Sequence, residues 1–571
     1  MRRFGRRRQD LEIAPDEIFL DTEKGGIFDR ARFEGRIEQP LSGATYLGLT
    51  MVLVLALSTL GVRAVYLQVV QGEALASQSA HNSLSETILF APRGLITDMH
   101  GVVLADNDTS ALGAVRRRYP YPELGAVIGY VSYPKKDSSG NYYDTKETGA
   151  AGLEERYDAQ LGGENGKMLV ETDAVGRVHS QGAVVGATPG ATLQLSIDAE
   201  LERHLAAAVA GRAKRSGFIA GAGVILDVDT GALRAIVSYP HYDPAVMSEG
   251  APSETIAAYH EDQGRPFLDH AIAGAYTPGS IVKPFVASGV LEDGLVTPST
   301  IIVDNALLTI PDPYNPGKEY RYTGWRALGA VDIRKAIAWS SDIYFYTVGG
   351  GFGSQRGLGI DRLNHWYRLF GFGTTTGVAL PGEVTGLLPD PAWKKRTFNE
   401  PWYLGDTYFT AIGQYSMQVT PLQAARATAA VANGGMLYTP ILVAGDAVTG
   451  SLVPVAPENL EVVRQGMRQT VTSGLAQMLN VPYVSVAAKT GTAQTGTRNQ
   501  YDNSWVIGFF PYEHPRYAFA VVLERGPEGA GSQAVNAMSD FFVSLHAADS
   551  VYVGGNGALA ASSTAPAPGP Y

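Results

Sequence analysis

The sequence predicts a chain of the α/β type, and more narrowly of the α+β class, built from three parts. An uncharged run at positions 41–62 predicts a membrane-spanning helix. A region rich in Gly, Tyr and polar residues then extends to about Gln194, with short strand-like runs that suit an elongated β-rich pedestal. Closely spaced apolar runs after residue 480 predict an antiparallel sheet, which we expect helices to flank.

The uncharged run is long enough, with its flanks, for one helix across a bilayer, which needs about 20 residues. We place this helix at 45–67, with a buried core helix as the alternative. Arginines at 2, 3, 6, 7 and 8 and, closer to the run, at 30, 32 and 36 precede it, and positive charge favours the cytoplasmic side. The sequence therefore predicts a single-pass protein of the cell membrane, with segment 1–44 cytoplasmic and the remainder extracytoplasmic.

The pedestal is assigned to residues 68–195 and the larger domain to residues 196–550. A helix is expected from Asp198 to Ala213, because Leu201, Leu205 and Val209 share one face. Residues 223–237 predict two strands around an Asp-Thr-Gly turn. The end, 551–571, is rich in Ala, Gly, Ser and Pro, and we expect it to be disordered.

Composition excludes several kinds of function. The chain has 571 residues, a net charge of −11 and no cysteine, which excludes disulfides, thiolate nucleophiles and cysteine-based zinc sites. His260-Glu261 lacks the second histidine of a zinc-protease motif, and no glycine-rich phosphate-binding loop is present. The acidic balance argues against a nucleic-acid partner. We expect neither a metal nor a cofactor.

Three short motifs predict a serine acyl-transfer site. The first is Ser280-Ile281-Val282-Lys283, which comes after the turn-forming Thr277-Pro278-Gly279. If 280–291 is helical, Ser280 lies at the helix start and Lys283 shares its face, within reach as a base. Free N–H groups at a helix N-terminus also favour a developing oxyanion.

A lysine can act as a base only when its proton is lost, and burial beside a second cation favours that loss. Lys489, in the third motif Lys489-Thr490-Gly491-Thr492, could supply the second charge. In the middle motif, Ser340-Ser341-Asp342, Ser340 could carry a proton between a lysine and the leaving amine, and Asp342 would complete the group.

The third motif ends the run 483–489, which we interpret as a strand, with further strands expected at 505–510 and 517–523. Gly491 has no Cβ, so a substrate backbone could pair along the strand there. Thr490 and Thr492 would contact that ligand.

The motifs also occur by chance within the chain. Ser132-Tyr133-Pro134-Lys135 matches the first motif, and Ser139-Gly140-Asn141 fits the middle motif better than Ser340-Ser341-Asp342 does. Both lie in a Lys-, Ser- and Gly-rich stretch, and we interpret them as surface loop. Ser280, Ser340 and Lys489 are distinguished by their apolar flanks and their order along the chain.

With these motifs, the chain resembles the class B penicillin-binding proteins, and within them the elongation-type, penicillin-binding protein 2-like peptidoglycan D,D-transpeptidases. The resemblance covers about Leu67 to Phe542. Further residues that carry it are Arg93-Gly94, Asp98, Gly101, Leu104-Ala105, Asn107, Gly152-Leu153-Glu154, Trp402-Tyr403-Leu404-Gly405-Asp406-Thr407, Ile412-Gly413-Gln414, Thr420-Pro421-Leu422-Gln423 and Asn433-Gly434-Gly435.

The resemblance implies a β-lactamase-like penicillin-binding domain in which Ser280 is acylated, Lys283 is its base and Ser340 relays the proton. Lys489 and Thr490 would orient the substrate, Thr492 would bind its terminal carboxylate, and the N–H groups of Ser280 and Thr492 would form the oxyanion hole. Two positions depart from the pattern: many members have Asn at Asp342 and Gly at Tyr415.

The implied function is cross-linking of peptidoglycan stem peptides through an acyl-enzyme with release of D-Ala, in cell elongation and shape maintenance. β-Lactam antibiotics would be covalent inhibitors. The implied partners are a SEDS-family glycan polymerase and other membrane proteins of the elongation complex. Two alternatives remain open: a D,D-carboxypeptidase or β-lactam-hydrolysing enzyme, in which water is the acceptor, and a non-catalytic β-lactam receptor or scaffold.

Overall fold

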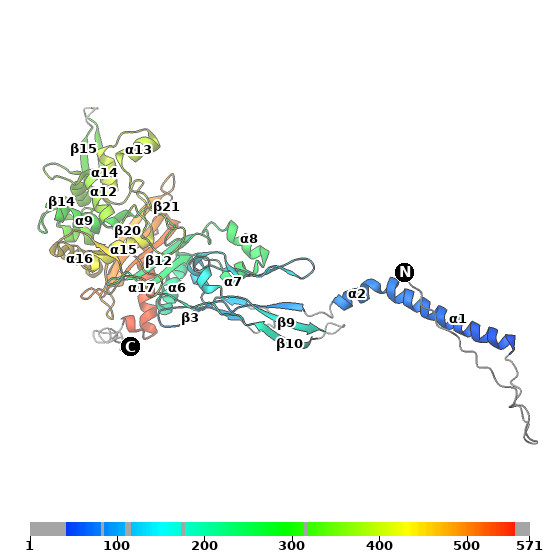
Figure 1. The fold of residues 1–571 in the computed structure, drawn as a ribbon. Helices are drawn as coiled ribbons and strands as arrows, with labels where there is room; N and C mark the ends of the chain where they lie inside the picture. The colour runs from blue at the N-terminus through cyan, green and yellow to red at the C-terminus, as the bar shows by residue number, and fades with distance from the viewer. Residues whose placement is uncertain are drawn as a thin grey trace, which may run out of the picture. The chain divides into compact units, whose positions relative to one another are not determined.

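The computed structural model describes residues 42–80, 85–108, 116–172, 178–312, 315 and 317–553 (Figure 1). Most of the expected cytoplasmic segment 1–44 and of the expected disordered tail 551–571 lies outside the described residues. The first three residues of that tail, Val551–Val553, instead form a 3₁₀ turn in which Tyr552 and Val553 are buried. Two compact units make up the chain. One takes in residues 1–83 and 171–179, and the other takes in residues 84–170 and 180–571.

Helix α1 (Gly43–Val65) corresponds to the predicted membrane span and starts two residues before it. Ser42 caps its first turn by accepting a hydrogen bond from the Thr45 N–H at 3.3 Å. The helix continues through a π-helical turn (Tyr66–Val70), and α2 (Gly72–Ala80) comes next. Residues Gly43–Val70 are long and apolar enough to cross a membrane, and the protein buries none of their most apolar stretch. That exposure argues against the buried core helix.

The pedestal is built from short strands. β1 (Ser85–Leu89) pairs antiparallel with β9 (Gly166–Thr172), which lies beside β10 (Val178–Val185). A second sheet has the order β11-β2-β3-β4, and two small hairpin pairs complete the pedestal. The bounds of these strands are β2 (Ile96–Thr97), β3 (Val103–Asp108), β4 (Arg116–Arg118), β5 (Val131–Ser132), β6 (Lys135–Lys136), β7 (Tyr142–Asp144), β8 (Thr148–Gly149) and β11 (Leu193–Gln194).

A buried ionic network joins the pedestal elements. Glu154, in α4 (Gly152–Arg156), is fully buried and accepts from Arg93 Nε at 2.6 Å and from Arg117 Nε at 2.7 Å. Asn107 donates from Nδ2 to the Arg93 carbonyl at 2.6 Å and accepts from Arg117 Nη1 at 3.3 Å. Because one carboxylate binds two buried guanidinium groups, removing it would leave Arg117 without its ion pair and Arg93 with Asp158 alone.

Asp98 connects the pedestal to the larger domain. Its Oδ1 accepts from the N–H groups of His100 and Val102, which closes a turn of the pedestal. Its Oδ2 accepts from the N–H of Ala199 at 3.1 Å, at the first residue of α6 (Ala199–Ser216). Asp198 caps the same helix, so the predicted helix at 198–213 is confirmed and extends three residues further.

The larger domain contains a five-stranded antiparallel sheet in the order β13-β12-β22-β21-β20. Its strands are β12 (Ala220–Asp227), β13 (Leu233–Tyr239), β20 (Ala487–Thr495), β21 (Tyr501–Phe510) and β22 (Tyr517–Pro527). β20 occupies one edge, so one side of its backbone is not covered by the sheet.

Helices cover both faces of this sheet. α6 and α17 (Gln533–Ala547) pack on one face around Leu205, Phe519 and Phe542, all buried. α15 (Pro421–Ala432) packs on the other face against β12, β21 and β22. The predicted antiparallel sheet flanked by helices, and with it the α+β class, is therefore confirmed.

The predicted strand at 483–489 is wrong at its start. Pro482 opens a turn through Val484, and the strand begins at Ala487. Strand β20 then continues through the whole third motif instead of ending at it. The apolar run did not indicate the start of the strand, because Val484 and Val486 are buried outside the sheet, where apolar residues are also favoured.

The pedestal also contains α3 and α5, and the larger domain contains further helices and strands outside the five-stranded sheet. Their bounds are α3 (Gly125–Ile128), α5 (Asp158–Leu161), α7 (Pro244–Glu249), α8 (Ser253–Glu261), α9 (Lys283–Glu292), β14 (Ile302–Asp304), β15 (Leu307–Pro311), β16 (Glu319–Thr323), β17 (Gly329–Val331), α10 (Ile333–Ala338), α11 (Asp342–Gly350), α12 (Gly359–Leu369), α13 (Pro391–Phe398), α14 (Leu404–Ala411), β18 (Met436–Tyr438), β19 (Gly450–Leu452) and α16 (Pro457–Thr472).

Candidate active site

Ser280 lies in a tight turn that leads into a buried helix. Residues Gly279–Val282 form a 3₁₀ turn, and α9 begins directly after it. Gly279 has a φ of +57°, and a Cβ there would lie 2.6 Å from the carbonyl oxygen of Thr492. Only glycine fits this close approach, which holds the Ser280 turn against the edge strand β20.

Lys283, the first residue of α9, is fully buried. Its Nζ donates to Asp342 Oδ1 at 2.6 Å, to Ser340 Oγ at 3.1 Å and to the Ser340 carbonyl at 2.9 Å. Burial lowers the pKa of Lys283, against the opposing effect of the Asp342 carboxylate. The lysine is therefore closer to its neutral, basic form than an exposed lysine is.

Ser340 brings the other two motifs together. It connects α10 to α11 with a φ of +56°, which is uncommon for a residue with a side chain. Its Oγ accepts from Lys283 Nζ at 3.1 Å and from Lys489 Nζ at 3.0 Å. One hydroxyl thus lies between two lysine nitrogens from different parts of the chain.

Lys489 is also fully buried, and its Nζ donates to the Thr490 carbonyl at 2.7 Å. Burial, and then the charge of Lys283, hold its pKa well below the ordinary value for lysine. The sequence predicts that the charge of Lys489 lowers the pKa of Lys283. In the structure the influence runs the other way, because the charge of Lys283 disfavours the charged form of Lys489, and burial is what lowers the pKa of Lys283.

At alternate residues of β20, the backbone N–H and C=O groups point toward the Ser280 turn. The Thr490 carbonyl contacts Lys489 Nζ, and the Thr492 carbonyl accepts from Gln414 Nε2 at 3.4 Å, so both point away from β21. In an antiparallel ladder the N–H of a residue points to the same side as its C=O. The N–H of Thr492 therefore faces the free edge of the sheet, where the Ser280 turn lies. The side chain of Thr492 is exposed, and that of Thr490 is buried.

Gly491 is closely packed by the protein itself. A Cβ at this position would lie 2.8 Å from Ile281 Cγ2, 2.9 Å from the Pro278 carbonyl and 3.2 Å from Trp505 Cβ. The absence of a side chain therefore lets the Ser280 turn approach β20. Pairing of a substrate backbone at Gly491 stays a prediction.

The structure brings Lys283, Ser340, Asp342 and Lys489 into direct contact, but it does not join Ser280 to Lys283. Among the described residues, no hydrogen bond links the Ser280 hydroxyl to the lysine, which donates to Ser340 and Asp342 instead. Catalytic hydrogen bonds are often long before substrate binds. The chance matches at Ser132 and Ser139 lie in the pedestal, in and beside the β6–β7 hairpin, where Lys135 is exposed.

Sequence reasoning missed Asp304, at the end of β14. This carboxylate is 1% exposed, and its Oδ2 accepts from Ser341 Oγ at 2.5 Å. Ser341 in turn caps α11 by accepting from the Tyr344 N–H at 3.1 Å. Asp304 therefore holds the segment that carries Ser340 and Asp342. No motif marks it, because its contact forms only when β14 pairs with β17.

Tyr415, the second departure from the family pattern, keeps the positive φ that a glycine would adopt, at +67°. Its ring lies edge-on to Trp402 at 5.7 Å and to Trp393 at 6.0 Å, and Lys394 Nζ lies 5.7 Å from the ring centre. Aromatic and cation–π contacts thus hold a strained residue next to Gln414, which contacts β20.

Two family models match most of the chain. Residues 221–542 match the family described as "Penicillin binding protein transpeptidase domain", and residues 111–195 match "Penicillin-binding Protein dimerisation domain". The first match takes in all three motifs.

Curated relatives cover most of the chain. The peptidoglycan D,D-transpeptidase MrdA of Escherichia coli K12 is 33% identical over 459 residues, which are 73% of this chain and 69% of the relative. MrdA of Haemophilus influenzae is 31% identical over 459 residues, 73% of this chain and 68% of the relative.

Solved structures share the fold. PBP2 of Pseudomonas aeruginosa, in complex with WCK 5153, has a TM-score of 0.67 at 29% identity and covers 83% of this chain and 99% of its own. A structure on the coordination of polymerization and crosslinking by a peptidoglycan synthase complex has a TM-score of 0.66 at 29% identity, and covers 88% of this chain and 98% of its own. A complex of PBP2 and MreC from Helicobacter pylori has a TM-score of 0.67 at 26% identity and covers 82% of this chain and 99% of its own. On motifs, geometry and relatives alike, the chain belongs to the penicillin-binding protein transpeptidases.

Proposed function

We propose that Ser280 is the nucleophile by which this protein, a membrane-anchored peptidoglycan D,D-transpeptidase, cross-links stem peptides during cell elongation. The observation that carries the assignment is the Ser340 hydroxyl, which accepts from two fully buried lysines at 3.0 and 3.1 Å. One of these lysines, Lys283, lies three residues after Ser280 in the chain. This arrangement provides a base and a proton path for acyl transfer.

In the acylation step, Ser280 Oγ attacks the carbonyl carbon of the D-Ala-D-Ala bond, and its proton passes to neutral Lys283. The C–N bond then breaks, and the departing D-Ala amine takes a proton through Ser340, which hydrogen-bonds both Lys283 and Lys489. The products are an ester on Ser280 and free D-Ala. An amine of a second stem peptide then attacks the ester and restores the serine.

The oxyanion hole is assigned to the backbone N–H groups of Ser280 and Thr492. The close approach at Gly279 brings these two backbone segments together, and N–H donors preorganised in this way stabilise a tetrahedral intermediate. The free edge of β20 would pair with the donor peptide, Lys489 and Thr490 would orient it, and the Thr492 hydroxyl would bind its terminal carboxylate.

The alternatives differ in the acceptor of the acyl group or in whether acylation occurs. A carboxypeptidase or β-lactam hydrolase would use the same residues with water as the acceptor. A non-catalytic receptor or scaffold is disfavoured, because burying two lysines lowers the stability of the fold. A protein that only binds a ligand would gain nothing from that loss.

Asp342 acts on the base in this proposal. Its carboxylate lies 2.6 Å from Lys283 Nζ and favours the charged form of the lysine, which raises the pKa of Lys283 against the effect of burial. We infer that Asp342 sets the pH at which Lys283 becomes neutral. Asp304 is a positioning residue, since it touches Ser341 and not the reacting atoms.

The chain is anchored in the membrane by α1, with segment 1–44 inside and the catalytic domain outside in this proposal. A SEDS-family glycan polymerase is the proposed partner, and it is supported by the likeness to a structure on polymerization and crosslinking by a synthase complex. Copurification of such a polymerase with the full-length chain, and not with a chain lacking residues 1–67, would support that pairing; equal recovery with both would contradict it.

Acylation by penicillin tests the nucleophile. The full-length protein should gain the mass of one penicillin, and Ser280→Ala should gain none, because the substitution removes the hydroxyl that forms the ester. Intact-protein mass spectrometry measures the label, and Ser132→Ala is the matched control. Labelling that persists in Ser280→Ala would rule out the assignment.

The same preparations then distinguish transfer from hydrolysis. With a donor ending in D-Ala-D-Ala and an amine acceptor, the cross-linked product should form together with D-Ala. If only the free acid forms, the protein is a carboxypeptidase under those conditions.

Asp342→Asn should move the acid limb of the acylation profile to lower pH. Removing the carboxylate destabilises the ammonium form of Lys283 and so lowers its pKa further, which makes the neutral base available at lower pH. Acylation rates from pH 5 to 9 measure the shift. Asp293→Asn, which removes an ion-paired carboxylate of similar exposure outside the three motifs, should leave the profile in place. A profile that Asp342→Asn leaves unchanged would remove this role.

Asp304→Ala should lower the stability of the protein by roughly 1–3 kcal/mol, because it leaves the buried Ser341 hydroxyl without its acceptor. It should also slow penicillin acylation. Asp304→Asn keeps an acceptor oxygen and should restore most of the rate. Asp243→Ala, which removes the cap of α7, should cost stability without slowing acylation. Equal rates for Asp304→Ala and Asp304→Asn would show that the acceptor does not matter.

Topology can be tested directly because the chain has no cysteine. A membrane-impermeant maleimide should label Glu73→Cys, just beyond the membrane helix, in intact spheroplasts. Glu34→Cys, before the helix, should be labelled only after the membrane is permeabilised. The reverse pattern would overturn the proposed orientation.

A further inference from the structure

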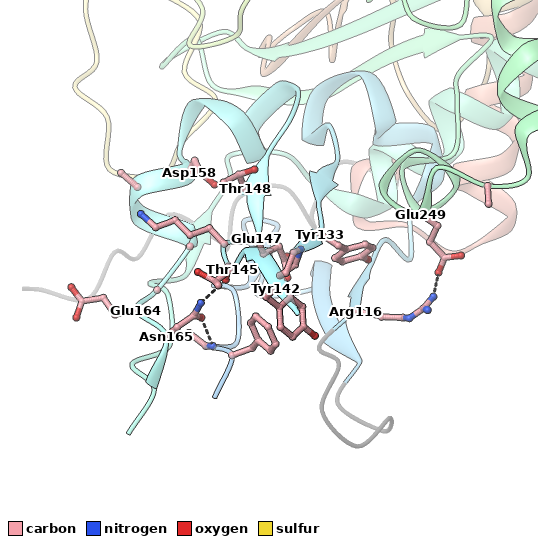
Figure 2. Close-up of a pocket in the computed structure, with 18 residues that line it drawn as sticks. Arg116, Tyr133, Tyr142, Thr145, Glu147, Thr148, Asp158, Glu164, Asn165 and Glu249 are labelled. Atoms are coloured by element: carbon pink, nitrogen blue, oxygen red, sulfur yellow. Dashed lines mark hydrogen bonds and ion pairs between the residues drawn. The ribbon is translucent and has the colours of Figure 1, made fainter. Parts of the chain in front are cut away.

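A recess of about 540 Å³ lies at the end of the five-stranded sheet, beyond the third motif. Its lining includes Thr495, the last residue of β20, and Thr277, three residues before Ser280. The pedestal has a recess of about 690 Å³, but none of its lining residues belongs to this sheet (Figure 2). The recess at Thr495 is therefore placed to receive part of a peptide that pairs with β20.

A stem peptide bound along β20 has one open direction in which to extend. Residues Ala487–Gly491 are buried, and the Val486 carbonyl just before them accepts from Arg468 Nη1 at 2.7 Å. Thr492, in contrast, is exposed, and Thr495 is half-buried. In the proposed function, on which this inference rests, the carboxyl end of the donor lies at the third motif. The earlier residues of the donor would then extend toward Thr495, antiparallel to β20.

Arg525 supplies the recess with a cation that the protein does not neutralise. It is exposed and forms no ion pair with a described residue. Its guanidinium carbon lies 4.7 Å from the centre of the Tyr501 ring. A guanidinium over a ring face keeps the N–H groups at its edge available, and these groups match the geometry of a carboxylate.

A β-bulge sets the position of Arg525. Asn503 lies opposite both Glu524 and Arg525, because the register of β21 and β22 shifts between Asp502 and Ser504. Arg525 has a φ of +52°, and its N–H donates to Asn503 Oδ1 at 2.9 Å. Bulges redirect side chains, and a residue with a side chain is strained at such a φ unless its surroundings hold it there.

Asn503 adds a hydrogen-bond donor that lacks a partner. Its side chain is 4% exposed and lines the recess. Because Oδ1 accepts from Arg525, the other amide atom is the donor Nδ2, which bonds to no described residue. Nδ2 is nevertheless not among the fully buried unpaired atoms, so a ligand can reach it. An acceptor on that ligand would remove the cost of leaving this donor unpaired.

The other charged groups of the recess neutralise each other. Arg265 Nη2 donates to both carboxylate oxygens of Glu524, at 2.9 and 3.0 Å. The buried His270 lies beside the same carboxylate, with its Nδ1 3.5 Å away. Among the described residues that line the recess, Arg525 is thus the charge without a counterion, and the recess favours an anion.

We propose that this recess binds a carboxylate of the donor stem peptide, on the N-terminal side of its D-Ala-D-Ala end. Arg525 neutralises the carboxylate in this arrangement, and Asn503 Nδ2 donates to it. Thr495 lies three residues beyond Thr492, about 10 Å along an antiparallel strand. An extended donor covers that span with about three residues, so the carboxylate belongs to the third residue before the scissile bond.

Two donor peptides test this recess on the full-length protein in detergent micelles. One is N-acetyl-γ-D-glutamyl-Nε-acetyl-L-lysyl-D-Ala-D-Ala, which has its free α-carboxylate on the third residue before the scissile bond. The other carries the amide of that carboxylate and is the neutral match. With an amine acceptor, kcat/KM from D-Ala release should be roughly tenfold higher for the carboxylate donor, because a charge-assisted hydrogen bond is stronger than a neutral one.

Arg525→Ala should remove most of this preference by slowing the reaction of the carboxylate donor alone. Asn503→Asp should remove it too, since this substitution keeps the acceptor for the Arg525 N–H and places a negative charge beside the carboxylate. Arg368→Ala is the matched control, because it removes an exposed arginine of α12 outside the recess. It should react like the parent protein.

Penicillin has no glutamyl residue and should label Ser280 in the parent protein and in all three variants, which checks that each of them folds and acylates. Equal kcat/KM for the two donors in a parent protein that penicillin labels would overturn this inference and leave the proposed function standing. A preference that survives Arg525→Ala would do the same. A parent protein that penicillin does not label would overturn the proposed function, and this inference with it.

Discussion

The constraint on which the active site depends is the burial of two lysines around one hydroxyl. Lys283 and Lys489 are both fully buried, and each donates to Ser340 Oγ. Burying an ion costs several kcal/mol even after relaxation, and a like charge nearby adds to that cost. The site is tolerable because the lysines shift toward their neutral forms, and neutral lysines are what a serine nucleophile requires. The burial that destabilises the site therefore also provides the neutral lysines that its chemistry requires.

The fold supplies the scaffold for this arrangement from three separate elements. α9 presents Lys283, the α10–α11 junction presents Ser340, and β20 presents Lys489. The sheet and its covering helices fix β20, while β14 fixes the junction through Asp304. Since the three elements are far apart in sequence, the contact between them exists only in the folded domain. The pedestal joins this framework through Asp98, which bonds the first turn of α6.

Sequence alone predicted the parts that depend on local chemistry. The helix after Asp198 and the apolar strands of the sheet each leave a local pattern, and the structure contains both. The helix predicted from Ser280 instead starts as a 3₁₀ turn, Gly279–Val282, and α9 begins at Lys283. It could not predict Asp304, because an isolated Asp acquires its role from a partner brought close by the β14–β17 pairing. The same holds for the preference of Lys283 for Ser340 and Asp342 over Ser280. The assigned catalytic roles remain predictions.

The two glycines at the active site also limit how the enzyme can evolve under antibiotic pressure. Side chains at Gly279 and Gly491 would collide with backbone atoms at 2.6 and 2.9 Å, so these positions cannot change without moving Ser280, the proposed nucleophile. An inhibitor that relies on the surface between the Ser280 turn and β20 therefore contacts a part of the protein that tolerates little variation. Substitutions that weaken binding of such an inhibitor while preserving wall synthesis must arise at other positions. Tyr415 shows that some positions near the site do vary, because this chain carries a side chain there in place of glycine and packs it against neighbouring rings.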